Sequence, residues 1–159
     1  MAFTIAIETP LQDDVRALVE QLNGHLLPLS PLEFQFKMSV EQMADPSTTL
    51  FVARDESGRA VGMGALKVHS PEIGEVKRMF TDPAIRGQRV GSSILQCIVN
   101  LAREKGLGTL MLETGTGEGM AEAHRLYSRS GFQPRGPFLD YPDSQWSAFF
   151  EMPLAAVPA

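Results

Sequence analysis

The stretch that most constrains the fold runs from Glu75 to Lys105, where a strand, a short basic loop and a helix follow one another. The strand part places Val76, Met79 and Phe80 among charged residues, and Asp82-Pro83 ends it. The helix part repeats apolar residues at helical spacing, namely Val90, Ile94, Cys97, Ile98 and Leu101. This order of elements favours a mixed α/β chain.

The loop between this strand and helix is suited to binding an anion. It contains two arginines and two glycines, at Arg86, Gly87, Arg89 and Gly91. Backbone N–H groups at a helix start have no intrahelical acceptor, and the helix dipole adds partial positive charge. The spacing is neither a P-loop nor a dinucleotide fingerprint. The residues alone therefore leave open an ordinary connection with solvated arginines.

Two segments give this chain a family resemblance. Arg86-Gly-Gln-Arg-Val-Gly91 resembles motif A of the GNAT-type N-acetyltransferases, which reads Arg/Gln-x-x-Gly-x-Gly/Ala after a strand and before a helix. Residues 123–132 resemble the family's Ala-x-x-Leu-Tyr-x-x-x-Gly-Phe segment. The two segments occur in family order, and the resemblance covers residues from about 50 to about 154.

The resemblance implies a GNAT-like α/β (α+β) fold, with a mixed sheet of about six to seven strands, about four helices and one domain over residues 1–159. It also implies an N-acetyltransferase that moves an acetyl group from acetyl-CoA directly to a primary amine of a small molecule or peptide. The alternative is a non-catalytic acyl-CoA sensor or regulatory module with the same fold.

The resemblance also assigns site residues. A β-bulge near Arg78, Met79 and Phe80 is expected to offer backbone groups to the acyl and pantetheine arms. The diphosphate is expected to lie on a loop and helix start made of Arg86, Gly87, Gln88, Arg89, Val90, Gly91 and Ser92. Tyr127 matches the general-acid position, although by pattern alone it is a core-edge tyrosine on an amphipathic helix. Its phenol has an ordinary pKa of about 10 and suits proton donation to a thiolate.

The base is less defined. Glu75 starts the strand where several members keep a base, yet it equally fits a solvated strand-edge carboxylate. Glu113 is a rival on the facing strand, and Asp140 and Glu72 are weaker candidates.

Two departures from the family pattern affect donor binding. Arg89 stands in place of the middle loop glycine, so its backbone is expected to avoid a conformation open only to glycine. Met120 stands where many members carry an Asn that bonds the pantetheine arm, and the missing hydrogen bond is worth about 1 kcal/mol.

Other reactive side chains fit structural roles. His69 precedes Pro71 at a strand end and is expected at the surface, and His124 lies off the helix face of Tyr127. Cys97 on the apolar stripe fits a buried structural thiol. No tight metal-ligand spacing is present, so no metal is expected.

The acceptor is expected to contact residues 25–38 and 136–141, and an acidic residue such as Asp140 or Glu33 is a candidate to hold a cationic amine. Residues 25–38 fit equally a hydrophobic lid held on the core. An exposed apolar edge on the last strand would suit a homodimer.

Composition narrows the function classes. The chain has 159 residues and a net charge of −5, which argues against a general nucleic-acid or anionic-membrane surface. Its one cysteine excludes an internal disulfide. There is no apolar run long enough to span a bilayer and no signal pattern, so a cytoplasmic location is expected.

The remaining elements follow from local pattern. Strands are expected at 3–7, 48–54, 60–69, 110–114 and 145–152, with a short strand from Phe132. Helices are expected from Thr9-Pro10 to Asn23-Gly24, from Ser39 through Met43 and over 120–129. Gly62 and Gly64 inside a strand indicate a bulge or a close approach of another backbone.

Overall fold

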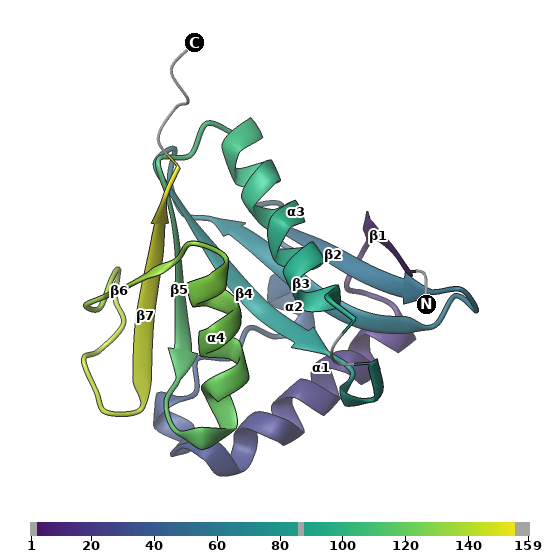
Figure 1. Ribbon diagram of the computed structural model, residues 1–159, viewed down its shortest axis with the longest axis horizontal. Coiled ribbons are helices and arrows are strands. Elements are labelled where there is room, and N and C mark those ends of the chain that lie inside the picture. Colours follow the sequence, from purple (N-terminus) through teal and green to yellow (C-terminus); the bar gives the residue numbers. More distant parts are fainter. Residues whose placement is uncertain (1–2, 86–87, 155–159) are drawn as a thin grey trace.

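The computed structural model describes residues 3–85 and 88–154. Its strands form one seven-stranded sheet in the order β1-β2-β3-β4-β5-β7-β6 (Figure 1). The strands are β1 (Phe3–Ile7), β2 (Thr48–Asp55), β3 (Ala60–Val68), β4 (Ile73–Thr81), β5 (Thr109–Gly115), β6 (Gln133–Arg135) and β7 (Ser147–Pro153). Only β4 and β5 pair in parallel, and every other neighbouring pair is antiparallel. The expected mixed sheet is confirmed.

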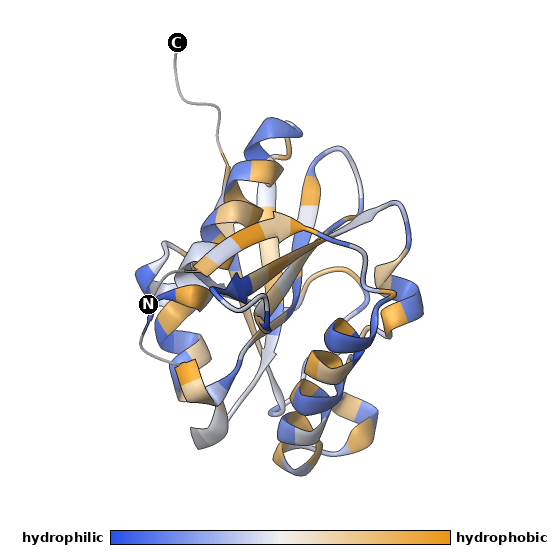
Figure 2. Ribbon diagram, turned by 90° about the vertical axis from the view of Figure 1, so that its right-hand side faces the viewer, coloured by the Kyte–Doolittle hydropathy of each residue, from blue (hydrophilic) through white to orange (hydrophobic). Residues whose placement is uncertain are grey.

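Four α-helices cover the two faces of the sheet. They are α1 (Asp13–Leu26), α2 (Val40–Met43), α3 (Val90–Glu104) and α4 (Ala121–Arg129), joined by short 3-10 turns. Helices α3 and α4 pack on one face and α1 and α2 on the other, so the core forms two layers (Figure 1). The helices carry stripes of apolar and polar residues, and the strands have apolar centres (Figure 2). Because apolar helix stripes pack against apolar strands, these patterns produce the layered arrangement.

The glycines of β3 let α3 lie close to the sheet. A Cβ at Gly62 would lie 2.9 Å from Val90 Cγ1, and one at Gly64 would lie 2.7 Å from Ile94 Cγ2. Real Cβ atoms do not come this close, so a side chain at either position would push the helix away. The sequence predicted a bulge or a close approach of another backbone; the register shift at Gly64 is such a bulge, and the nearest neighbours of both glycines are side chains.

Strand β4 carries the expected bulge. Met63 pairs with Phe80 and Ala65 pairs with Lys77, so Gly64 faces two residues, Arg78 and Met79. Arg78 has a φ of 56°, in the left-handed region. A bulge bends the strand and raises its twist, and here it turns β4 away from β5.

The parallel pairing of β4 with β5 is short. It joins Ile73 to Thr109, Gly74 to Leu110 and Glu75 to Met111, and then stops. Figure 1 shows the two strands diverging beyond this point. The opening between them is the main gap in an otherwise continuous sheet, and it lies beside the N-terminal half of α4 and residues 34–37.

Several element boundaries differ from the sequence expectations. Helix α1 begins after Gln12, without a side-chain cap, and continues past Gly24 to Leu26 because a Cβ-free residue with ordinary helical φ does not stop a helix. Strand β7 lies between β5 and β6, so the last strand is not an edge. The expected cap at Ser39 is present as a full capping box with Gln42.

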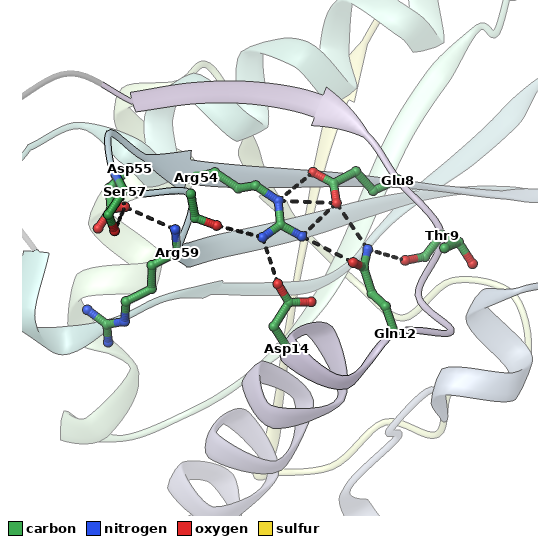
Figure 3. Close-up of polar contacts among 9 residues, drawn as sticks. Glu8, Thr9, Gln12, Asp14, Arg54, Asp55, Ser57 and Arg59 are labelled. Atoms are coloured by element: carbon green, nitrogen blue, oxygen red, sulfur yellow. Dashed lines mark hydrogen bonds and ion pairs between the residues drawn. The ribbon is translucent and has the colours of Figure 1, made fainter.

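A half-buried arginine ties the N-terminal elements to the sheet. Arg54 on β2 holds Glu8 at 2.8 Å and Asp14 at 2.6 Å, and it also donates to Gln12 Oε1 and Gly58 O (Figure 3). Its hydrogen bonds lower the pKa of both carboxyl groups. One side chain thus joins the end of β1, the start of α1 and the β2–β3 turn.

We predict that Arg54→Met lowers the free energy of unfolding by about 1–3 kcal/mol at pH 7, because a half-buried carboxylate loses its partner. The pKa values of Glu8 and Asp14 are lowered in the folded protein, so their ionised forms stabilise the fold at pH values above the ordinary carboxyl pKa near 4. This contribution is lost as pH falls through the lowered values, so the difference from wild type should shrink toward pH 3. Urea unfolding at several pH values measures it.

The matched control is Arg16→Met. Arg16 meets Glu41 at 3.5 Å, with side chains 45% and 70% exposed, so its loss should change stability by less than about 0.5 kcal/mol. Equal effects of the two substitutions, or a pH-independent difference for Arg54→Met, would contradict the role given to Arg54.

Candidate active site

The opening between β4 and β5 is a cavity of about 140 Å³. On one side it is walled by residues 76–79 of β4, and on the other by residues 113–115 of β5. Residues from α1, the segment 34–37 and α4 close its ends. Because β4 and β5 no longer pair here, backbone groups of both strands are open to an extended ligand. We call this cavity the donor cleft.

Tyr127 stands at the donor cleft. Its side chain is 6% exposed and packs at ring-centre distances of 6.0 Å and 6.1 Å from Phe132 and Phe150. Its hydroxyl makes no hydrogen bond to the described residues. Burial and the nearby charge of Glu113 raise its pKa above the ordinary value near 10. The hydroxyl is therefore protonated at neutral pH and free to donate into the cleft.

Glu113 faces the donor cleft from β5. Its carboxylate accepts a hydrogen bond of 2.7 Å from Ser147 Oγ. Burial is the main cause that raises the pKa of this carboxyl group. A carboxyl group with a raised pKa is a suitable proton carrier near neutral pH, so Glu113 keeps its place as the rival to Glu75.

The start of α3 lies at the expected diphosphate site. Ser93 N donates to Arg89 O, so the N–H groups of Val90, Gly91 and Ser92 precede the helical ladder. Arg86 and Gly87 lie outside the described residues. Gln88 is half-buried and Arg89 is exposed.

Arg89, the residue before α3, has a left-handed backbone conformation with φ 63° and ψ 21°. This region is uncommon for residues other than glycine but is open to them, so the structure does not contradict the expectation that Arg89 avoids a conformation open only to glycine.

A second cavity, of about 650 Å³, lies on the face of the sheet covered by α2. Its lining combines three segments that are far apart in sequence, which are residues 36–47, the β3–β4 ends from Lys67 to Lys77, and residues 139–141. We call it the acceptor-side cavity. Parts of both segments expected to contact an acceptor, 25–38 and 136–141, lie along it.

Glu75 lies at the base of the acceptor-side cavity with its side chain 3% exposed. Its Oε1 lies 2.8 Å from His69 Nε2, and its Oε2 accepts a 2.5 Å hydrogen bond from the Tyr141 hydroxyl. Lys77 Nζ lies 3.4 Å from Oε2 and donates to the Tyr141 oxygen at 2.8 Å. The interpretation of Glu75 as a solvated edge residue is wrong.

His69 belongs to this network. Its backbone is at the surface, as expected, but its side chain is only 22% exposed and turns toward Glu75. This contact depends on the pairing of β3 with β4, so the sequence alone did not predict it. The alternation of Glu75 and Lys77 on one strand face was a usable signal for their proximity.

The other candidates fall outside the network. Glu72 is exposed and Glu33 lines neither cavity, whereas Asp140 is exposed on the acceptor-side cavity. His124 bonds the Gly115 carbonyl at 2.8 Å. Met120 lines the donor cleft and its Cγ would lie 3.3 Å from a Cβ at Gly115.

Cys97 packs half-buried against the core, and burial raises the pKa of its thiol, which fits a structural thiol. The described residues contain no group of three or more His, Cys, Asp or Glu side chains placed to hold a metal. In the same part of the chain, the helices are all too short or too polar to cross a membrane.

These features match a known family. A family model for an acetyltransferase (GNAT) domain matches residues 46–134. The chain belongs to the GNAT family. It is 42% identical over 152 residues to the "IAA acetyltransferase" of Azospirillum brasilense, covering 95% of this chain and 97% of that protein. GNAT enzymes use acetyl-CoA, so this chain is an acetyl-CoA-dependent N-acetyltransferase.

Solved structures of GNAT proteins share the fold. A putative acyl-CoA N-acyltransferase from Klebsiella pneumoniae superposes with a TM-score of 0.83 at 31% identity, over 96% of this chain and 98% of that one. A GNAT acetyltransferase from Elizabethkingia anophelis, solved with acetyl-CoA bound, gives a TM-score of 0.65 at 16% identity, over 95% and 97% of the two chains.

We predict that Gly91→Ala weakens CoA binding without harming the fold. A Cβ at Gly91 would lie 3.4 Å from Leu126 Cδ2 and 3.5 Å from Thr81 Oγ1, which are ordinary contacts. Alanine also favours the helix by up to about 1 kcal/mol. A diphosphate packed on this backbone would be displaced, so calorimetry should show Kd for CoA rising about tenfold, roughly 1.4 kcal/mol.

Ser93→Ala, two residues further into α3, is the control and should leave the Kd unchanged. Wild-type affinity in a stably folded Gly91→Ala protein would show that the diphosphate does not lie on this helix start.

Proposed function

We propose that this GNAT enzyme transfers the acetyl group to a primary amine of a small molecule or peptide bound in the acceptor-side cavity. The observation that carries the proposal is the meeting of two cavities. Phe36, Lys37 and Lys77 line both the donor cleft and the acceptor-side cavity. A thioester reaching through the opening of the sheet would meet an acceptor entering from the other side.

The residues of the donor cleft suit acetyl-CoA. The start of α3 would hold the diphosphate with its free N–H groups and the side chains of Gln88 and Arg89, and Arg86 and Gly87 complete the proposed loop. The unpaired edges of β4 at Met79 and Phe80 and of β5 would receive the pantetheine arm. Acetyl-CoA supplies an activated acetyl thioester, and this chain supplies binding, orientation and proton transfer.

Direct transfer needs two protons to move. The amine nitrogen bonds to the acetyl carbon, the carbon–sulfur bond breaks, the nitrogen loses a proton and the sulfur gains one. We assign the sulfur side to Tyr127, whose buried hydroxyl has no hydrogen-bond partner among the described residues. Since its pKa is raised, it acts first as a hydrogen-bond donor that stabilises the developing thiolate.

We assign the nitrogen side to Glu75 and His69. Glu75 Oε2 accepts from the Tyr141 hydroxyl, with Lys77 paired to it at 3.4 Å, while Oε1 faces His69 Nε2 at 2.8 Å. In the imidazole tautomer that carries its hydrogen on Nδ1, the Nε2 lone pair can take a proton that Glu75 has received, and the partly exposed ring leads to solvent. The proton thus moves from the amine through the Tyr141 hydroxyl or water to Glu75, and on to the imidazole.

Three further proposals concern setting. We propose that residues 1–159 act as one acetyltransferase domain, and that it works in the cytoplasm, where acetyl-CoA is available.

We also propose a homodimer, supported by two exposed apolar residues at and beside the β1 edge of the sheet. They are Ile7, which is 62% exposed, and Leu11, which is 50% exposed. Sedimentation that shows only monomer would contradict the proposed homodimer.

We predict that Tyr127→Phe lowers kcat about a hundredfold or more, in line with the usual contribution of a positioned proton donor. Binding of CoA and thermal stability should stay at wild-type values, because the ring contacts are kept. Release of free thiol across an amine panel measures the rate, and calorimetry measures binding.

Unchanged turnover in Tyr127→Phe would remove its role as acid. Wild-type protein that binds CoA yet acetylates no amine would instead favour the alternative of a non-catalytic acyl-CoA sensor.

We predict that His69→Gln lowers kcat at least tenfold with little change in KM for acetyl-CoA, and that the acidic limb of the pH–rate profile moves. Added imidazole should restore part of the rate, which a purely structural role would not allow. The matched control is His25→Gln, because His25 is exposed in the last turn of α1. A wild-type profile in His69→Gln would exclude it from proton transfer.

A further inference from the structure

The junction of the two cavities has an unusual charge. Among the described residues, only Phe36, Lys37 and Lys77 line both cavities. The two that are charged are cations. Glu113 belongs to the donor cleft alone, and the acids of the acceptor-side cavity belong to that cavity alone. The point where acetyl donor and acceptor meet is therefore bordered by two ammonium groups.

The nearby acids are already engaged. Glu75 accepts from the Tyr141 hydroxyl, faces His69 Nε2 and forms an ion pair with Lys77. Asp45 accepts from Ser47 N at 2.8 Å and Ser47 Oγ at 2.6 Å. Glu41 forms its ion pair with Arg16. Glu75 and Glu41 are thus paired with cations, whereas Asp45 and Asp140 keep their negative charge but line only the acceptor-side cavity and not the junction.

The two lysines differ in how far their charge is balanced. Lys77 is 13% exposed and is held by Tyr141 and Glu75. Lys37 is half-buried and makes no hydrogen bond or ion pair to the described residues. Lys37 lines both cavities, and because no described residue pairs with its ammonium group, the three N–H donors of that group are available to a ligand.

An uncompensated cation has two effects on an amine acceptor. It disfavours the protonated form of an amine placed beside it, which lowers the amine's pKa and promotes the neutral nucleophile. It also attracts an acidic group attached next to that amine. A polyamine gains from neither effect, because its remaining positive charges would face the same lysines.

We propose that the acceptor is an amine carrying an acidic group one or two atoms away, such as an α-amino acid, with that group held by Lys37. This inference rests on the proposed amine acetyltransferase function and names its substrate class. Phe36 and Tyr141, in edge-to-face contact at 5.1 Å, add an aromatic wall for an apolar side chain. Asp140 lies on the exposed part of the same cavity, where it could bind a polar substituent farther from the reacting amine.

The test compares acceptors that differ only in the acidic group. We expect wild-type kcat/KM for phenylalanine to exceed that for phenylalaninamide at least tenfold, and glycine to exceed glycinamide in the same direction. Spermidine should be a poor acceptor. In Lys37→Gln the ratio of acid to amide should fall to near one, mainly through a higher KM for the acid.

The ratio separates this role from general damage, since an unstable protein loses both rates together. The matched control is Lys105→Gln, at the exposed C-terminal end of α3, which should keep the wild-type ratio. Preference for amides or spermidine, or an unchanged ratio in Lys37→Gln, would overturn the inference. A higher KM for acetyl-CoA with every acceptor would also overturn it, because Lys37 would then serve the donor.

The two proposals fail in different ways. Absence of turnover with all of these amines, with CoA binding intact, would contradict the amine acetyltransferase function itself. Turnover with the wrong charge preference would contradict only the role of Lys37.

Discussion

The geometry of this enzyme depends on the parting of two parallel strands. Pairing of β4 with β5 stops at Glu75 and Met111, and the bulge at Arg78–Met79 turns β4 away. A continued ladder would fill the sheet with hydrogen bonds and leave no passage between its faces. Because the ladder stops, backbone groups become available to a ligand, and the donor cleft meets the acceptor-side cavity through the sheet.

The rest of the structure stabilises this opening. Glycines in β3 allow α3 to press against the bulged strand, which fixes the helix start that faces the donor. Below the opening, Glu75 is buried with Tyr141, His69 and Lys77, so four polar groups from three segments are locked together. Such a network is costly unless every member is satisfied, and it contains the residues of the proposed proton path.

Local patterns in the sequence predicted much of this fold. The strand, loop and helix over residues 75–105, the capping box at Ser39 and the glycines in β3 are each signalled by neighbouring residues. The family resemblance added the bulge near Arg78, Met79 and Phe80. Chemistry carried by backbone groups is readable in this way, because glycine positions and helix starts constrain local geometry.

Contacts between distant segments were not predictable. His69 reads as a surface residue until β3 pairs with β4, and Tyr141 reaches Glu75 across 66 positions of sequence. The proposed role of Lys37 was not predictable either, because it follows from the position of this residue in the lining of both cavities. Arg89 takes a left-handed φ of 63°, which its residue type does not signal. Helix α1 runs through Gly24 because packing of its apolar face outweighs a weak stop signal.

The central claim is that the acetyl donor threads the opening between β4 and β5. Titration of ¹⁵N-labelled protein with CoA, followed by amide NMR, tests it most directly. The account predicts saturable shifts at Val90–Ser92, along residues 76–80 of β4 and along residues 113–115 of β5, with small changes at the Arg54 cluster. Saturable shifts confined to other surfaces, with these amides unmoved, would contradict it.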